Sequence, residues 1–338
     1  MLAECRRVLI VKLSSIGDVV HALPVSAAIK RSFPHIVLDW IVEDMSADML
    51  IDNPCLDNLY ILPRRKWKPK RYSISTWREG WTIAKQLRAN RYDLAIDLQG
   101  LLKAAVWTVG CGAKRRYGYN RLREGSRFLM KRVERRPESV HVVDQYLDVP
   151  RFLGATVDPV EFPIQISPDD TAKADALLAN VGIDREFVSL NPSAGREWKR
   201  WPVERFAELS DRIERDLGLQ TLFVGGPGDV ELGERAKGFK KEAFRSTIAQ
   251  TTLKQLARVI QRSALHVCGD TGSAHIASAV GAACVSLFGP TDPDRTGPYG
   301  QREWAIYRPD GLSEIAVDEV FKLVELRLAK VAKDPAGY

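Results

Sequence analysis

A carboxylate follows the first predicted strand of the chain. In VLIVKLSSIGDVV (8–20), a short apolar run and Lys12 are followed by two serines, a glycine and Asp18. A carboxylate beyond the C-terminal end of a strand is well placed to act as a general base. It can equally serve the next helix alone, because an acidic residue in the first turn gains about 0.3 to 1 kcal/mol from the helix dipole. From these residues both interpretations stay open.

A second group of residues is suited to binding an anion. In GDTGSAHIASAVGAACVSLFGPTDP (269–293), Thr271 and Gly272 open a predicted helix, and His275 lies one turn further along. The free N–H groups and the positive dipole end of such a helix favour a phosphate, and glycine lets a diphosphate approach the backbone. The structural alternative is that Asp270 or Thr271 only caps the helix, which is worth about 1 kcal/mol.

Two further loops can complete a nucleotide site. In NPSAGREWKRWP, Ser193 belongs to a loop of small residues that leaves the backbone accessible, and Lys199 can supply an ammonium group. Lys199 can also be an ordinary solvated charge. GGPGDVELGE has neither the spacing of GxGxxG nor a GK[ST] sequence, but Glu231 or Asp229 is available to a ribose diol.

The positive charge of the chain is local. The net charge is +7, yet 64–71 has six basic residues among eight, and 114–136 has ten basic residues against two acidic ones. Such segments attract anions, which include nucleic acid, a membrane face and a phosphorylated or acidic substrate.

Predicted elements place these residues at comparable positions in two halves. Strands alternate with helices before residue 155 and again after 170, which predicts parallel sheets covered on both faces. The segment between them has three prolines and no helical period, and is predicted to be a linker. Two Rossmann-like domains in sequence predict a cleft onto which the C-terminal ends of the strands converge.

Composition predicts a cytoplasmic protein. The N-terminal apolar run is too short for the core of a signal peptide, and no run approaches the roughly 18 residues that span a bilayer. The five cysteines are scattered without a CxxC pair, which indicates reduced thiols and neither a disulfide framework nor a zinc site.

Three segments together resemble one enzyme family. KLSSIGDVVHALP, NPSAGREWKRWP and GDTGSAHIASAVGAACVSLFGPTDPDRTGPYG, in this order and spacing, are similar to the ADP-heptose:lipopolysaccharide heptosyltransferases of glycosyltransferase family 9. The resemblance extends from Val8 to about Tyr307. IDLQGLLKAA and LREGSRFLMKRV look most like heptosyltransferase I within that family.

The resemblance implies an α/β GT-B fold, with two Rossmann-like domains whose parallel sheets face an interdomain cleft. The expected parts are an acceptor-binding domain (1–155), a linker (156–170), a nucleotide-sugar domain (171–316), and a C-terminal helix (317–338) that packs back on the first domain.

The resemblance also implies a role for particular residues. Asp18 matches the catalytic base. The residues expected to bind the donor are Ser193, Lys199, Glu231, Asp270, Thr271, Gly272 and His275. The residues expected to bind the acceptor are Ser15, Gly17, Arg64, Arg65, Lys66, Gln99 and Arg123.

The implied reaction is inverting transfer of L-glycero-D-manno-heptose from ADP-heptose to Kdo of Kdo-lipid A, with no metal or other cofactor. The enzyme is expected at the cytoplasmic face of the inner membrane, bound peripherally, with no nucleic-acid partner. Trp67, Trp77 and Trp81 can enter the membrane interface or lie in the core, and the core is favoured for Trp81.

Three alternatives remain beside this prediction. One is a heptosyltransferase of type II, whose acceptor is heptosyl-Kdo-lipid A. Another is a nucleotide-sugar 2-epimerase with the same architecture, which would release free sugar without an acceptor. The third is a nucleic-acid-binding protein that stacks bases on Tyr117, Tyr119 and Trp67.

Overall fold

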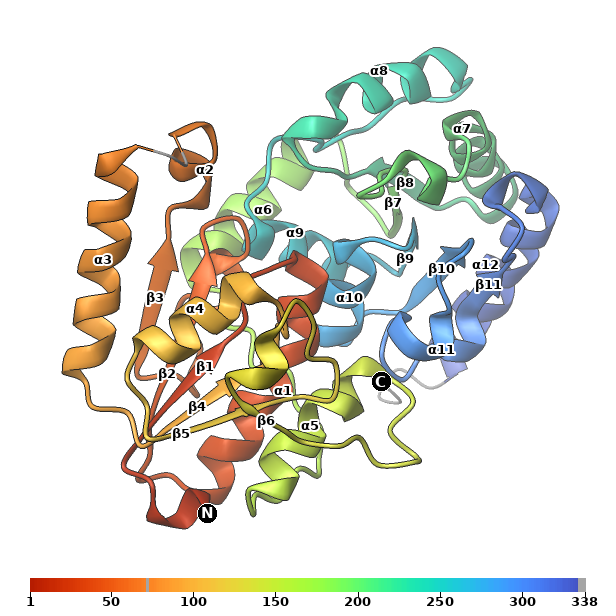
Figure 1. Cartoon of the computed structure of the whole chain (residues 1–338). Helices are drawn as coiled ribbons and strands as arrows, with labels where there is room; N and C mark the ends of the chain where they lie inside the picture. The colour runs from red at the N-terminus through yellow and green to blue at the C-terminus, as the bar shows by residue number, and fades with distance from the viewer. Residues whose placement is uncertain (71–72, 334–338) are drawn as a thin grey trace. The chain divides into compact units, whose positions relative to one another are not determined.

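The computed structural model describes residues 1–70 and 73–333, which form two compact units, Met1–Gln165 and Ile166–Tyr338 (Figure 1). The boundary between the units lies inside the predicted linker. Arg71 of the basic segment 64–71 and residues 334–338 of the predicted C-terminal part lie outside the described residues. Both units are built on parallel sheets, so the predicted α/β class is confirmed.

The described residues of the first unit include a six-stranded parallel sheet in the order β3-β2-β1-β4-β5-β6. Val11 of β1 is level with Ile41 of β2 and Asp97 of β4, so these strands end at one edge of the sheet. The strands are β1 Arg7–Val11, β2 Val37–Glu43, β3 Asn58–Leu62, β4 Leu94–Asp97, β5 Arg115–Gly118 and β6 Lys131–Arg132.

Helices of the first unit pack in pairs, α1 with α5 and α3 with α4. The paired arrangement buries an apolar cluster in which Leu9 and Ile41 of the sheet meet Leu87 of α3 and Ala104 of α4. The helices are α1 Ile16–Ser32, α2 Arg64–Trp67, α3 Ile74–Ala89, α4 Leu102–Gly110 and α5 Val142–Phe152.

The described residues of the second unit repeat this plan with a five-stranded parallel sheet in the order β11-β10-β9-β7-β8. Its strands are β7 Phe187–Asn191, β8 Gln220–Phe223, β9 Leu265–Gly269, β10 Cys284–Phe288 and β11 Ala305–Tyr307. Its helices are α6 Pro168–Asn180, α7 Val203–Arg212, α8 Val230–Phe239, α9 Leu253–Arg262, α10 Gly272–Ala279, α11 Pro293–Thr296 and α12 Val317–Lys333.

The two faces of the second sheet differ in chemistry. Side chains alternate between the faces along each strand, so Val188, Leu190 and Val267 join the apolar core with α7 and α12. Ser189 and His266 point to the other face, on the side of α9 and α10. One face of this sheet therefore packs against an apolar core, and the other face carries buried polar groups.

The C-terminal helix α12 belongs to the core of the second unit. Val320, Phe321 and Val324 are buried in that core, and Trp201 donates a 2.9 Å hydrogen bond to the carbonyl of Ile315 just before the helix. Helix α12 thus buries its apolar face in the second unit, because those side chains complete that unit's core. Its expected packing on the first domain stays a prediction.

Among residues 1–70 and 73–333, no helix combines the length and the apolarity that crossing a membrane requires.

Candidate active site

Asp18 lies in the first turn of α1, at the sheet edge where β1 ends. Ser15 is the N-cap, and both its backbone N–H (3.1 Å) and its hydroxyl (2.9 Å) donate to Oδ2 of Asp18. Gly17, which lies between Ser15 and Asp18 in the sequence, is buried. The Asp18 side chain still exposes 44% of its surface. The carboxylate therefore caps its helix, as the structural interpretation predicts, and remains accessible from solvent for chemistry.

A buried lysine lies beneath this carboxylate. Nζ of Lys12 donates to the carbonyl of Leu98 (3.0 Å) and to the hydroxyl of Tyr146 (2.8 Å). The same nitrogen lies 3.9 Å from Oδ1 of Asp18. Burial of a lysine needs such partners, because an ammonium group without them is costly to desolvate. No local sequence pattern indicates this role of Lys12.

Gln99 holds the loop that carries Asp18. Its Oε1 accepts hydrogen bonds from the backbone N–H groups of Leu13 (3.1 Å) and Ser14 (3.0 Å). Asp97 in turn accepts from the backbone N–H of Gln99 (2.7 Å), and burial raises the pKa of this carboxyl group to about 6. The predicted acceptor-binding residue Gln99 thus has a visible role in positioning the loop.

A charged cluster adjoins the same loop. Glu43, the last residue of β2, binds Nζ of Lys103 (3.1 Å) and lies 4.0 Å from Nε of Arg64. Lys103 also donates to the hydroxyl of Ser14 (2.6 Å). Sequence reasoning missed Glu43 and Lys103, although their positions after β2 and in the first turn of α4 put both at this edge.

The other predicted acceptor residues belong to exposed segments of the first unit. Arg65 and Lys66 are exposed on α2, where Lys66 binds Glu79 at 2.5 Å. The backbone N–H of Arg123 donates to the carbonyl of Gly100 (2.7 Å), which ties the exposed Arg123 loop to the end of β4.

The basic segment 114–136 does not form one surface. Lys114 and Arg115, at the start of β5, form ion pairs of 3.6 Å with Asp93 and Glu4 at the sheet edge opposite Asp18. The segment contributes two strands to the sheet, so its basic residues are divided between opposite edges.

In the second unit, α10 begins directly after β9, and Thr271 is its N-cap. Gly272 is the first helical residue, and Asp270 forms an ion pair with Lys199. A Cβ atom on Gly269 would meet the carbonyl oxygen of Lys199 at 3.2 Å, so glycine permits the close approach of this loop. His275 is buried one turn into the helix. The predicted donor residues of these two segments therefore gather at one edge.

A buried amide joins the two donor loops. Oδ1 of Asn191, at the end of β7, accepts from the backbone N–H of Ser193 (2.9 Å), and Nδ2 donates to the hydroxyl of Ser273 (2.9 Å). The hydroxyl of Ser273 is also hydrogen-bonded to Nε2 of His266 (2.9 Å), and Nδ1 of His266 is hydrogen-bonded to the hydroxyl of Ser189 (2.8 Å). These contacts fix the N-terminus of α10 relative to the loop after β7.

The loop after β8 contributes an acidic pair of unequal character. Asp229 accepts a 2.5 Å hydrogen bond from the hydroxyl of Ser193 and a 2.7 Å bond from the backbone N–H of Gly226. Glu231 is exposed in the first turn of α8. Of the two carboxylates considered for a ribose, Asp229 is engaged within the loop, whereas Glu231 faces solvent.

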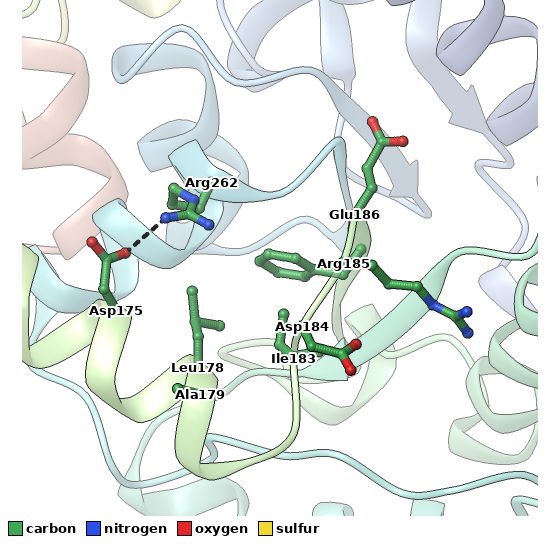
Figure 2. A pocket seen from close by; sticks show the side chains of 9 residues that line it. Asp175, Leu178, Ala179, Ile183, Asp184, Arg185, Glu186 and Arg262 are labelled. Atoms are coloured by element: carbon green, nitrogen blue, oxygen red, sulfur yellow. Dashed lines mark hydrogen bonds and ion pairs between the residues drawn. The ribbon is translucent and has the colours of Figure 1, made fainter.

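A pocket of about 330 Å³ lies away from all these residues (Figure 2). It is at the N-terminal end of β7, opposite the end that carries Asn191, and Arg262 binds Asp175 at 3.2 Å across its margin. Its walls comprise Asp175, Leu178, Ala179, Ile183, Asp184, Arg185, Glu186, Phe187 and Arg262. The expectation that Asp18 and the α10 N-terminus meet across a cleft between the units stays a prediction.

Within the two described ranges, no three His, Cys, Asp or Glu side chains gather in a way that could hold a metal ion.

The chain is similar to curated heptosyltransferases over most of its length. Lipopolysaccharide heptosyltransferase 1 of Pseudomonas aeruginosa is 32% identical over 312 residues, which is 88% of this chain and 82% of that protein. Lipopolysaccharide heptosyltransferase 1 of Escherichia coli O18:K1:H7 is 29% identical over 332 residues, 96% of this chain and 99% of that protein.

Solved structures share its fold. A family 9 glycosyltransferase from Veillonella parvula matches with a TM-score of 0.86 at 23% identity, over 98% of this chain and 99% of that chain. E. coli heptosyltransferase WaaC with ADP matches with a TM-score of 0.78 at 26% identity, over 95% of this chain and 99% of that chain.

The model of glycosyltransferase family 9 (heptosyltransferase) matches residues 80–314, which include Gln99, Asn191 and the N-terminus of α10. The predicted family is confirmed: the chain belongs to glycosyltransferase family 9.

Proposed function

We propose that this enzyme transfers L-glycero-D-manno-heptose from ADP-heptose to a Kdo residue of Kdo-lipid A, in the synthesis of the lipopolysaccharide inner core. Heptose transfer rests on the family and on relatives named lipopolysaccharide heptosyltransferase 1. One observation carries the chemical assignment: Asp18 is an accessible carboxylate just beyond the C-terminal end of β1. Gln99 holds the loop that leads to it through hydrogen bonds from the backbone N–H groups of Leu13 and Ser14.

Asp18 acts as the general base in this proposal. It takes the proton from a Kdo hydroxyl while that oxygen attacks the anomeric carbon of heptose, and ADP leaves from the opposite face, so the configuration inverts. Ser15 orients the carboxylate through two hydrogen bonds to Oδ2. Gly17 keeps the approach to the carboxylate unobstructed.

The second unit stabilises the leaving group. Negative charge grows on the departing diphosphate, and the backbone N–H groups at Thr271 and Gly272, the positive end of α10 and Lys199 face that charge. Lys199 binds Asp270 in the structure, so the diphosphate shares an ammonium group that is already held in position. With this charge supplied by the protein, we expect transfer to need no metal ion.

Remaining donor and acceptor roles follow from position and charge. Glu231 faces solvent after β8 and suits the ribose diol, Ser193 suits the phosphates, and His275 supports the α10 turn. On the acceptor side, the cations of Arg64, Arg65, Lys66 and Arg123, with Gln99, suit the carboxylate of Kdo and the phosphates of lipid A. We further propose that the enzyme acts in the cytoplasm as a peripheral protein of the inner membrane.

The direct experiment measures ADP release from ADP-heptose in three reactions: one with Kdo-lipid A, one with heptosyl-Kdo-lipid A, and one without an acceptor. The proposal predicts release with Kdo-lipid A and a heptosylated product by mass spectrometry. Turnover with heptosyl-Kdo-lipid A alone would instead identify the type II reaction. Release of free sugar without an acceptor would point to an epimerase and would overturn the transfer mechanism.

A further inference from the structure

Helix α3 carries a row of large apolar side chains on its outer face. Ile74, Trp77 and Trp81 expose 72%, 70% and 75% of their surfaces, and their spacing of three and four residues aligns them along one side of the helix. Single exposed apolar residues are ordinary on protein surfaces, but two adjacent tryptophans exposed to this degree indicate a binding face. The expectation that Trp81 lies in the core is therefore wrong.

The opposite face of α3 already has its packing partners. Leu87 is buried in the apolar cluster of the first unit, and Ile83 packs against it. The Cβ position of Gly80 lies 4.0 Å from the rings of Trp67 and Trp107. Because these inward residues attach the helix to the unit, the outer tryptophans are not needed for folding of the helix onto its neighbours.

The surroundings of this row are strongly basic. Residues 61–90 include nine lysines and arginines and a single acidic residue, Glu79. Glu79 is engaged by Lys66 and by the indole N–H of Trp67. Arg78 and Lys85 are exposed, and helical spacing places them on the same side as the tryptophans. Figure 1 shows α2 beside the N-terminal end of α3, and the cations of α2, Arg64, Arg65 and Lys66, are exposed.

We propose that the outer face of α3, defined by Ile74, Trp77, Arg78, Trp81 and Lys85, docks flat on an anionic lipid bilayer. Indole rings favour the headgroup region, where the ring is in contact with apolar chains and its N–H with water. Neighbouring cations are attracted by anionic headgroups, by about fivefold in affinity for each one near the surface. The row is too short to span a bilayer and is suited to lying in its interface.

Charge decides between a lipid surface and a second copy of the chain. A symmetric contact through α3 would bring two strongly basic segments together, and like charges oppose such a contact. A bilayer that contains phosphatidylglycerol supplies both the apolar layer and the missing negative charge. This inference rests on the proposed function, in which the acceptor is itself a lipid of the membrane.

Vesicle binding tests the surface with full-length protein. We compare co-sedimentation with phosphatidylcholine vesicles that contain, or lack, 30 mol% phosphatidylglycerol. Trp77→Ala/Trp81→Ala is expected to lower partitioning into anionic vesicles at least tenfold. Arg78→Gln/Lys85→Gln is expected to lower it about 25-fold, because each cation contributes about fivefold. The matched control is Phe239→Ala, which removes an aromatic ring that is 52% exposed on α8 of the second unit.

Turnover separates docking from catalysis. With a deacylated, soluble Kdo acceptor, both double variants are expected to keep wild-type turnover within about twofold, whereas turnover on Kdo-lipid A in vesicles falls with their binding. The docking proposal is overturned if both double variants bind vesicles as well as wild type does. It is also overturned if light scattering shows that wild type is a dimer and that only the tryptophan variant is a monomer. Absence of transfer by wild type to the soluble acceptor, with vesicle binding intact, counts against the proposed function alone.

Discussion

The ammonium group of Lys12 lies 3.9 Å from Oδ1 of Asp18, and it reaches this carboxylate from inside the core. Ser15 holds the other carboxylate oxygen from the solvent side. The proposed base is thus placed between a buried cation and the helix cap that fixes its direction.

Replacement of Lys12 by methionine tests the electrostatic part of this arrangement. Without this ammonium group 3.9 Å from Oδ1 of Asp18, kcat/KM at neutral pH is expected to fall by up to about tenfold, a modest loss because solvent screens the half-exposed carboxylate. Tyr146→Phe is the control, since it removes one partner of Lys12 and leaves the charge. Identical values of kcat/KM for Lys12→Met and wild type would contradict the role given to the lysine.

Gly100→Ala tests the turn that holds the Arg123 loop. Gly100 has φ of +70°, and a Cβ atom there would meet the carbonyl oxygen of Arg121 at 2.2 Å. The expected result is a loss of about 2 to 4 kcal/mol in the free energy of unfolding, with a raised KM for the acceptor. Gly125→Ala has φ of +80° and no atom within 4 Å of the added Cβ, so it should cost only about 1 kcal/mol. Equal costs in chemical denaturation would exclude the close contact as the cause.

Asn191→Leu tests the bridge between the donor loops. The variant loses the hydrogen bonds to Ser193 and Ser273, so calorimetry should find ADP bound about tenfold more weakly, while KM for the acceptor is unchanged. Ser189→Ala, at the far end of the polar chain, should lower stability and leave the affinity for ADP intact. If both variants weaken ADP binding to the same degree, the effect is a general loosening of the unit.

Asp97 predicts a measurable dependence of stability on pH. Burial raises the pKa of its carboxyl group to about 6, above the ordinary value of 3.8, so the folded protein binds this proton more tightly than the unfolded chain. The stabilising contribution of this group is full below about pH 4 and is lost as the pH rises through 6. The unfolding free energy of wild type minus that of Asp97→Asn should therefore fall by on the order of 2 to 3 kcal/mol between pH 4 and 7. A pH-independent difference would show that Asp97 is ionised throughout.

Apolar patterning predicted the strands that build both sheets, because buried parallel strands are short, nearly continuous apolar runs. The strand predicted ahead of Asp18 is β1, and the helix predicted to open at Thr271 and Gly272 is α10. Strands β5 and β6 were not predicted, because the basic segment 114–136 has no long apolar run. Pairing with neighbouring strands stabilises them in the sheet. Helix α8 begins inside the glycine-rich stretch GGPGDVELGE and was not expected either.

The candidate site was predictable where it follows strand ends, and not where it depends on contacts between distant residues. Asp18 and Thr271 lie where the alternation of strands and helices put them. Lys12 meets Tyr146 across 134 positions of sequence, and Gln99 meets Leu13 across 86, and no local pattern indicates such partners. The core was favoured for Trp81, yet only packing decides which face of α3 is covered.

Turnover of Asp18→Asn is the most direct test of the central claim. Asparagine keeps the shape of the side chain and can accept the hydrogen bonds of Ser15, but it cannot take up the proton of the attacking hydroxyl. With saturating ADP-heptose and soluble Kdo acceptor, kcat is expected to fall by at least about a hundredfold, while ADP affinity and thermal stability stay near wild type. A folded Asp18→Asn enzyme with near-normal kcat would contradict the assignment of the base.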